Sequence, residues 1–490
     1  MNFRMHLYIL AKVMLIEGIL MLIPTVCALF YGETDKLIIY LSCSAVSALL
    51  GLVIGNIKPK NTNIYLKDGC VVTAESWLLL SLIGCVPFLI TGEIPRFTDA
   101  VFETVSGFTT TGSSILTDVE ALSHASLIWR SLTHWIGGMG VLVFLLAVVP
   151  MSGGSNMNLL IAESPGPSVG KLRPKVRSTA KALYLIYLGL TLLEILVLVI
   201  TGMPVFDSLC SAFGTAGTGG FGIRNDSFAS YAPHIQWIVA VFMIVFGVNF
   251  NFYYLIFAKQ PGKAFKMEEI RGYLLVILAA VAVICVNTFS ITGELWSTLR
   301  NSVFQVATII TTTGFASTDF DTWPTLSKLI LVSLMFIGAC AGSTGGGIKI
   351  SRFQIRLKTL TREIDRYLHP RTVKKIQMDG KPLDAEVIRS VTVYFMAFLL
   401  LFSASVAIVS LEGYDLVTSF TSVAATINNI GPGLAMVGPT QNYAFLSDLS
   451  KWVLIVDMLA GRLELFPLII FLYPGTYRNS YQNKLPRIIK

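Results

Sequence analysis

Thr109-Thr110-Thr111-Gly112 is the first of four short polar segments that interrupt long apolar stretches of this chain. The other three are Thr218-Gly219-Gly220-Phe221, Thr311-Thr312-Thr313-Gly314 and Asn428-Asn429-Ile430-Gly431. Irregular backbone in a membrane is tolerated only where it is buried in protein or lines a water-filled cavity, because an unpaired carbonyl in hydrocarbon costs several kcal/mol. The four segments therefore predict one shared polar axis.

The glycines in these segments indicate what the axis is lined with. Glycine lets the backbone turn carbonyl oxygens toward a common centre, because it adopts left-handed conformations without the steric penalty of a Cβ. Rings of backbone carbonyls are how a protein replaces the water shell of a potassium ion. The four segments together predict a pore.

The composition is that of an integral membrane protein. Of the 490 residues, 54% are hydrophobic and 13% are charged, whereas soluble domains average about 45–50% apolar and about 25% charged residues. Apolar stretches of about 20 residues predict membrane-spanning helices. They lie near 5–30, 37–57, 71–91, 127–150, 180–201, 235–257, 272–292, 326–348, 388–411 and 447–473.

Lysine and arginine gather in alternate loops between these spans, most densely in residues 352–381 and in the C-terminal tail. By the positive-inside rule, both termini are expected in the cytoplasm. The net charge of +8 follows from this topology, so membrane lipid is an expected partner and nucleic acid is not. The seven scattered cysteines are typical of small core residues rather than disulfides or metal ligands.

After the first two spans, one order of elements recurs: a span, a short amphipathic segment, a polar turn and a second span. The short segments are 98–108, 205–214, 296–310 and 414–427. Each is too short to cross a bilayer. Each begins near an acidic or capping residue, namely Asp99, Asp207, Ser297 or Asp415. We expect re-entrant pore helices, whose negative dipole ends favour a cation near the centre.

Several longer motifs resemble one family. They are Phe108-Thr109-Thr110-Thr111-Gly112, His134-Trp135-Ile136-Gly137-Gly138-Met139-Gly140, Asn428-Asn429-Ile430-Gly431-Pro432-Gly433 and Gly461-Arg462-Leu463-Glu464. In this order they are similar to motifs of the Trk/Ktr/HKT superfamily of potassium transporters. The two additional N-terminal spans resemble its TrkH/TrkG branch, and the likeness covers nearly the whole chain.

The resemblance implies an all-α polytopic membrane protein with four pseudo-symmetric helix–pore helix–helix repeats around a central pore, plus two N-terminal helices. The N-terminal pair is expected in 1–68 and the repeats in 69–178, 179–267, 268–384 and 385–490. The resemblance further implies a homodimer in the bacterial inner membrane and a cytoplasmic Trk-type nucleotide-binding regulatory ring. It implies potassium as the ion and no organic cofactor on this chain.

By the same resemblance, a potassium-binding filter uses the backbone carbonyls of the polar segments. Its residues are Thr110, Thr111, Gly112, Thr218, Gly219, Gly220, Thr312, Thr313, Gly314, Asn429, Ile430 and Gly431. Gly220 is preferred over Gly219 as the filter glycine, because Phe221 then matches Phe315 after Gly314. Potassium is favoured because Gly112 stands where plant relatives with sodium preference carry Ser. The fourth segment departs most from the pattern.

A second polar interruption runs from Gly338 to Gly347 inside a predicted span. So many glycines, each about 1 kcal/mol less favourable than Ala, cannot belong to a stable helix interior. The resemblance implies a mobile intramembrane gate below the third segment. Its residues are Gly342, Ser343, Thr344, Gly345, Gly346 and Gly347. The alternative is close helix packing through small residues.

Charged residues inside the spans are expected to face the bundle interior or a cavity. Arg462 lies mid-way in the last span, and the resemblance implies a barrier to cations below the filter; the alternative is a salt bridge to Glu464 or Asp457. Glu103 is read either as attracting cations to the outer mouth or as a solvated charge. His134 is read as a hydrogen-bonded core histidine and Arg130 as an outer anchor or packing pair.

Potassium uptake through a channel-like path, gated from the cytoplasm, is the function these observations favour. An inside-negative potential drives a cation inward with about 2.3 kcal/mol per 100 mV, so conduction needs selectivity and a gate but no chemistry. The alternative is a proton- or sodium-coupled symporter of the same fold. An enzyme is not expected, because residues 342–347 lack the Lys-Ser/Thr ending of a P-loop and no nucleophile or metal cluster is recognisable.

Overall fold

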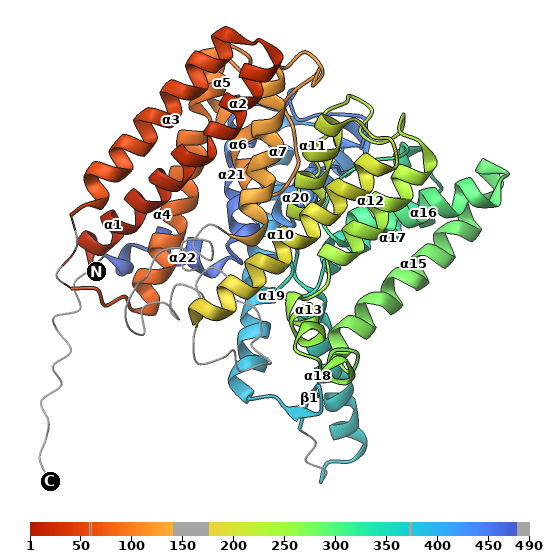
Figure 1. Ribbon diagram of the computed structural model, residues 1–490. Coiled ribbons are helices and arrows are strands. Elements are labelled where there is room, and N and C mark those ends of the chain that lie inside the picture. The colour runs from red at the N-terminus through yellow and green to blue at the C-terminus, as the bar shows by residue number, and fades with distance from the viewer. Residues whose placement is uncertain (58, 60, 141–175, 372–374, 478–490) are drawn as a thin grey trace, which may run out of the picture.

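The computed structural model describes residues 1–57, 59, 61–140, 176–371 and 375–477 (Figure 1). At the N-terminus, α1 (Phe3–Leu20) and α2 (Leu22–Tyr31) form one apolar span that packs against α3 (Thr34–Gly55). Glycine allows this close approach: a Cβ on Gly18 would lie 2.6 Å from the Ala48 nitrogen. The pair stands at one edge of the molecule, beside the first repeat.

The remaining chain repeats one order of helices four times. The first repeat contains α4 (Leu66–Gly84), α5 (Val86–Thr91), the pore helix α6 (Phe97–Phe108) and the inner helix α7 (His124–Met139). The second contains α10 (Val176–Ile200), the pore helix α11 (Val205–Gly217), the bent inner helix α12 (Pro233–Phe246) and α13 (Phe250–Phe257), and α14 (Pro261–Ala264).

The third repeat contains α15 (Glu268–Thr292), the pore helix α16 (Leu295–Ile310), η1 (Phe320–Thr322), and the interrupted inner helix α17 (Thr325–Ile337) and α18 (Ile350–Leu368). A small antiparallel pair follows, β1 (Gln377–Met378) with β2 (Lys381–Pro382). The fourth contains α19 (Ala385–Val409), η2 (Ser410–Glu412), the pore helix α20 (Leu416–Ile427), η3 (Ala435–Val437), α21 (Asp448–Arg462), α22 (Phe466–Leu472) and η4 (Pro474–Thr476).

The inner helices join the repeats into a closed ring. Helix α7 packs on the next pore helix α11, α12 on α16, and α17 on α20. Helix α21 of the last repeat packs on α6 of the first. The same contact thus recurs at every boundary, including the one that joins the end of the chain to its beginning. The predicted all-α fold of four repeats plus two N-terminal helices is confirmed.

Among the described residues, six helical spans are long and apolar enough to cross a membrane without a sharp bend. They correspond to the predicted spans that begin the chain or begin a repeat. The other four predicted spans are the inner helices, which are short or broken; α12 and α13 meet at 87°. The breaks fall at 247–249, at 338–349 and at 463–465. The predicted span 127–150 extends past Gly140 into residues outside the described part.

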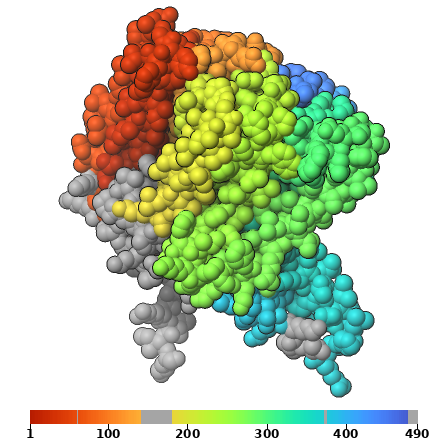
Figure 2. Space-filling model, turned by 45° about the vertical axis from the view of Figure 1, so that its right-hand side comes forward, coloured from red at the N-terminus to blue at the C-terminus, as the bar shows by residue number. Residues whose placement is uncertain are grey.

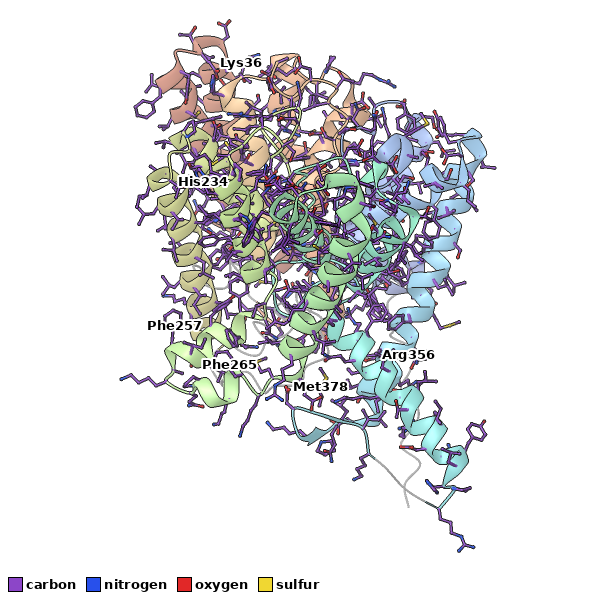
Figure 3. The ribbon with its side chains drawn as sticks, turned by 90° about the vertical axis from the view of Figure 1, so that its right-hand side faces the viewer. Lys36, His234, Phe257, Phe265, Arg356 and Met378 are labelled. Carbon is purple, nitrogen blue, oxygen red and sulfur yellow. The ribbon has the colours of Figure 1, made fainter. Side chains whose placement is uncertain are left out.

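A band of exposed apolar side chains separates the two ends of the molecule. Figure 3 shows Lys36 at one end and Arg356 of α18 at the other. Between them, large apolar side chains are exposed on the outer helices, such as Leu278 and Val286 of α15, which is typical of a lipid-facing surface. Helix α18 and the start of α19 project beyond the body at the end that carries Arg356 (Figure 2).

Of the four residues expected near the starts of the pore helices, one is the capping residue and the others lie within the helices. Asp415 caps α20, accepting a hydrogen bond from the Thr418 N–H at 3.0 Å. Asp99 and Asp207 instead lie in the first turns of α6 and α11, and α16 begins two residues before Ser297. Acidic residues in a first turn still favour a helix by interacting with the positive end of its dipole.

Candidate functional site

The four polar segments share one backbone geometry. In each, a non-glycine residue adopts a left-handed conformation: Thr110 (φ 56°), Thr218 (55°), Thr312 (60°) and Asn429 (55°). Two residues later stands a left-handed glycine: Gly112 (φ 80°), Gly220 (79°), Gly314 (87°) and Gly431 (99°). The spacing matches Gly220, and not Gly219, to the other three glycines. Left-handed residues at every second position turn successive carbonyls toward the same side.

The four glycines form a ring with their neighbours' carbonyls. A Cβ on Gly112 would lie 2.1 Å from the Gly219 oxygen, one on Gly220 2.1 Å from the Thr313 oxygen, one on Gly314 2.1 Å from the Ile430 oxygen, and one on Gly431 2.8 Å from the Thr111 oxygen. Each glycine therefore lies against the carbonyl that precedes the next glycine around the ring. A side chain at any of these positions would displace the neighbouring carbonyl, so glycine is required for the ring to keep this geometry.

Polar side chains behind the ring hold the segments in shape. The hydroxyls of Thr109 and Thr111 are 2.8 Å apart, and those of Thr311 and Thr313 are also 2.8 Å apart. In the fourth segment, the Asn429 amide donates to the Thr111 hydroxyl at 2.9 Å. The segment that differs most in sequence thus has the shared backbone and is tied directly to the first.

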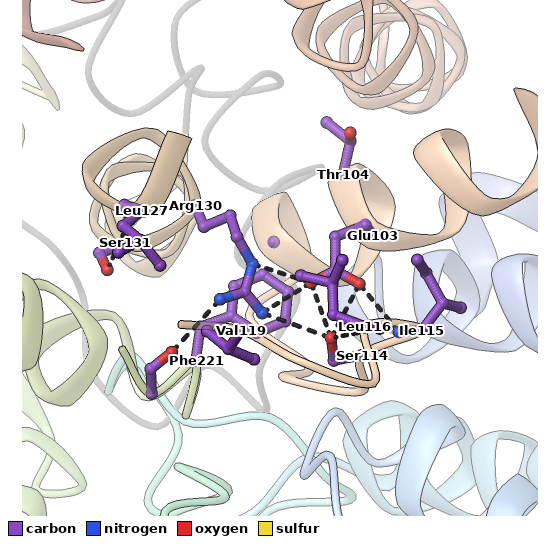
Figure 4. A network of polar contacts seen from close by, with 12 residues as sticks. Glu103, Thr104, Ser114, Ile115, Leu116, Val119, Leu127, Arg130, Ser131 and Phe221 are labelled. Carbon is purple, nitrogen blue, oxygen red and sulfur yellow. Dashed lines mark hydrogen bonds and ion pairs between the residues drawn. The ribbon is translucent and has the colours of Figure 1, made fainter. Parts of the chain in front are cut away.

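Glu103 and Arg130 form a buried ion pair close to the ring (Figure 4). The Glu103 Oε1 accepts from Arg130 Nε at 2.9 Å and Nη2 at 2.7 Å. Its side chain is 0% exposed, so the interpretation of Glu103 as a solvated charge is wrong, and attraction of cations to the outer mouth stays a prediction. The sequence alone did not indicate that Glu103 and Arg130 form a pair, because 27 positions separate them.

His134 also lies against the ring. Its Nε2 accepts from the Phe221 N–H at 3.1 Å, and its Nδ1 is 2.7 Å from the Gly107 carbonyl oxygen. Because Nε2 is the acceptor, the proton resides on Nδ1 and is donated to Gly107. The imidazole thus links the end of α6 to the segment that follows Gly220, with both nitrogens engaged.

The predicted break in the third inner helix is an irregular loop between Ile337 and Ile350, and it lies directly against two of the polar segments. The Gly346 N–H donates to the Thr312 hydroxyl at 2.6 Å. A Cβ on Gly346 would lie 2.7 Å from the Asn428 oxygen. The loop therefore contacts the third and fourth segments from the side on which α18 begins.

The loop is anchored by residues that sequence reasoning missed. Glu269 of α15 accepts from the Ala341 N–H at 2.6 Å and from the Asn249 amide at 3.3 Å. The Phe250 N–H donates to the Gly342 oxygen at 3.0 Å. Glu269 lies before the predicted span 272–292, so no sequence signal indicated that this carboxylate is buried.

Arg462 connects this loop to the first repeat. Its guanidinium donates to the carbonyl oxygens of Thr344 at 2.8 Å, Gly137 at 2.5 Å and Gly138 at 2.6 Å. The two salt-bridge partners suggested by the sequence are engaged elsewhere: Glu464 pairs with Arg352, and Asp457 accepts from Ser405 at 2.7 Å. The arginine thus lies beside the loop and at the end of α7.

Comparisons with known proteins agree with this architecture. The TrkH family model, described as cation transport protein, matches residues 38–475. The chain is 34% identical to the Trk system potassium uptake protein TrkH of Salmonella typhimurium, covering 98% of this chain and 100% of that protein. It is 33% identical to the Trk system potassium uptake protein TrkG of Escherichia coli, covering 94% and 95%.

A solved structure has the same fold. The crystal structure of the potassium transporter TrkH from Vibrio parahaemolyticus superposes with a TM-score of 0.88 at 31% identity, covering 98% of this chain and 100% of that one. The family resemblance of the sequence motifs is thereby confirmed. The chain is a multi-pass membrane protein that belongs to the TrkH family of cation transport proteins.

Proposed function

We propose that this chain conducts potassium into the cell through the ring formed by its four polar segments. The observation that carries the proposal is the closed contact of each filter glycine with the carbonyl before the next. That arrangement supplies carbonyl oxygens around one axis and no fixed carboxylate, which suits a weakly hydrated monovalent cation. The relatives named above as potassium uptake proteins support the same ion.

The filter in this proposal consists of the residues predicted from the sequence, with Gly112, Gly220, Gly314 and Gly431 as its glycines. The close fit at each glycine restrains the carbonyls in their positions. A sodium ion, being smaller, needs a closer approach of the carbonyls than potassium does. Tight packing between segments opposes that movement and favours the larger ion.

The loop 342–347 and Arg462 form the gate in this proposal. The loop touches the filter segments, and Arg462 places a positive charge next to it. A unit charge near a passing cation raises its energy by about 1–4 kcal/mol at an effective dielectric of 20–80. Moving the loop and arginine aside would open the path.

Regulation from the cytoplasm enters through α18, which begins directly after the loop and projects beyond the body. We place both termini and α18 in the cytoplasm of a bacterium, and the chain in its inner membrane as a homodimer. A cytoplasmic nucleotide-binding ring that pulls on α18 would move the loop through a continuous helix.

Cation flux into liposomes that contain the purified protein tests the function. Potassium and rubidium should enter faster than sodium and lithium, driven by a membrane potential alone. Equal entry of potassium and sodium would contradict the proposal. Uptake that requires an imposed pH gradient or added sodium would instead support coupled symport.

A further inference from the structure

We propose that Glu103 and Arg130 are positioning residues that set the spacing between the first and second filter segments, and with it the preference for potassium over sodium. This inference rests on the proposed function, because it assigns a role within the same filter. The pair touches neither the axis nor the gate loop in any described contact. Its effect must therefore act through the backbone that it holds.

On one side, the pair holds the segment that leaves Gly112. The Glu103 carboxylate accepts from the Ile115 N–H at 3.0 Å and from the Ser114 hydroxyl at 3.0 and 3.1 Å. Ser114 and Ile115 follow the filter glycine by two and three residues. A fully buried carboxylate thus fixes the outer end of the first segment to its own pore helix, as Figure 4 shows.

On the other side, Arg130 reaches the second segment. Its Nη1 donates to the Gly222 oxygen at 3.3 Å, and its guanidinium carbon lies 4.0 Å from the centre of the Phe221 ring. Phe221 is the residue after Gly220. His134, one helical turn further along α7, binds the Phe221 N–H. Helix α7 therefore contacts the second segment through two side chains, Arg130 and His134. The same arginine is paired with Glu103, which holds the first segment.

This arrangement occurs at one boundary between segments. Nine residues before the filter glycine, the four repeats carry Glu103, Ser211, Gln305 and Ser422. The carboxylate is present in the first repeat alone. At the next boundary the residue after the glycine is Phe315, which packs against Phe228 with ring centres 4.6 Å apart. The first boundary is held by charge and the second by aromatic packing.

The physical consequence follows from burial. The exposed fractions of the Glu103 and Arg130 side chains are 0% and 2%, so their attraction is poorly screened and their geometry is strongly restrained. As a pair they add no net charge near the path. Their contribution to ion selection is to fix the distance between the carbonyls of the first and second filter segments. A fixed distance resists the inward movement of these carbonyls that a sodium ion requires.

The test compares the ratio of potassium to sodium uptake in liposomes between the native protein and two variants. Arg130→Lys keeps the charge but loses the planar fork that reaches Glu103 and Gly222 together. The double variant Glu103→Gln/Arg130→Gln removes both charges, so that it leaves no buried charge unpaired. We expect each to lower the ratio at least about fivefold, equivalent to about 1 kcal/mol.

Asp99→Asn/Lys451→Gln is the matched control, because it also removes both members of a buried ion pair. Asp99 lies on the same pore helix and pairs with the buried Lys451 at 2.6 Å, but its ion pair joins α6 to α21 rather than one filter segment to another. A general loss of packing would lower uptake of all cations equally in the control and in the test variants. A role in positioning lowers the potassium-to-sodium ratio in the test variants alone.

The outcomes separate the inference from the proposed function. Unchanged ratios in both test variants, with the native protein selective, would overturn the inference and leave the function standing. A native protein that does not discriminate would overturn the function itself. If one test variant does not reach the membrane, the other decides: an unchanged ratio in the variant that does reach it overturns the inference. Phe221→Leu removes the ring that lies under Arg130 and beside His134, and an unchanged ratio there would show that the ring contact takes no part in the positioning.

Discussion

Gly112 faces the carbonyl oxygen of Gly219 so closely that a Cβ on Gly112 would lie 2.1 Å from that oxygen. Real Cβ atoms do not approach so near, so any side chain at 112 must displace the carbonyl. The first filter segment and the second are therefore fitted to each other at the level of the backbone.

Gly112→Ser should lower the preference for potassium over sodium, because the displaced Gly219 carbonyl can no longer keep its place in the ring. We expect a decrease of at least about tenfold, or about 1.4 kcal/mol, in the ratio of potassium to sodium uptake. Gly189→Ser is the matched control, since Gly189 of α10 has no heavy atom near its Cβ position. An unchanged ratio in Gly112→Ser would show that this carbonyl does not select the ion.

Arg462→Ala should increase potassium flux, because it removes a positive charge beside the loop that lies against the filter. A barrier of about 1 kcal/mol corresponds to roughly a fivefold change in rate. Arg389→Ala, at an exposed position on α19, serves as the control. Loss of the Arg462→Ala protein from the membrane, measured by expression, would instead assign the guanidinium a structural role through its bonds to Thr344, Gly137 and Gly138.

Deletion within residues 342–346 should give a folded protein that conducts without any regulatory subunit. The segment contributes little apolar packing, and its contacts with Thr312 and Asn428 place it against the filter. The measurement is basal rubidium uptake into liposomes that contain this chain alone. If basal uptake stays as low as in the native protein, the loop does not close the path.

Reversing Arg362 and Arg366 to Glu should weaken co-purification with a nucleotide-binding partner while leaving basal potassium conduction intact. Both side chains lie on α18, and that of Arg366 is 73% exposed. Arg356 is kept, because it donates to the Thr392 hydroxyl at 3.0 Å and so binds α18 to α19. Undiminished partner binding would move the interface to the other basic loops.

The sequence was sufficient for features encoded by local chemistry. Short glycine-containing polar turns between apolar stretches predicted the four segments. The match of Phe221 to Phe315 selected Gly220, which the backbone angles also single out. The glycines between Gly338 and Gly347 predicted the interruption of the inner helix. In each case the backbone conformation itself requires the residue type.

Contacts between distant segments could not be predicted in this way. Glu103 and Arg130 are separated by a filter segment and a loop, and only the folded ring brings them together. Glu269 likewise holds Ala341 across 72 positions of sequence. The bend after Phe246 was also missed, since a continuous apolar stretch predicts a span by composition and says nothing of the 87° turn within it.

The ring of four repeats is formed by one polypeptide, and this has a consequence for the charge near the axis. In a tetramer of identical subunits, an arginine at the level of Arg462 would appear four times, and four guanidinium groups around one narrow path would repel one another and every cation. Here one polypeptide closes the ring through the contact of α21 with α6. Each repeat can therefore have its own sequence. The last repeat can therefore carry Arg462 and the third repeat the glycine-rich loop 342–347, without a copy of either in the other repeats. In the proposed function, this asymmetry confines the moving parts of the pathway to one side.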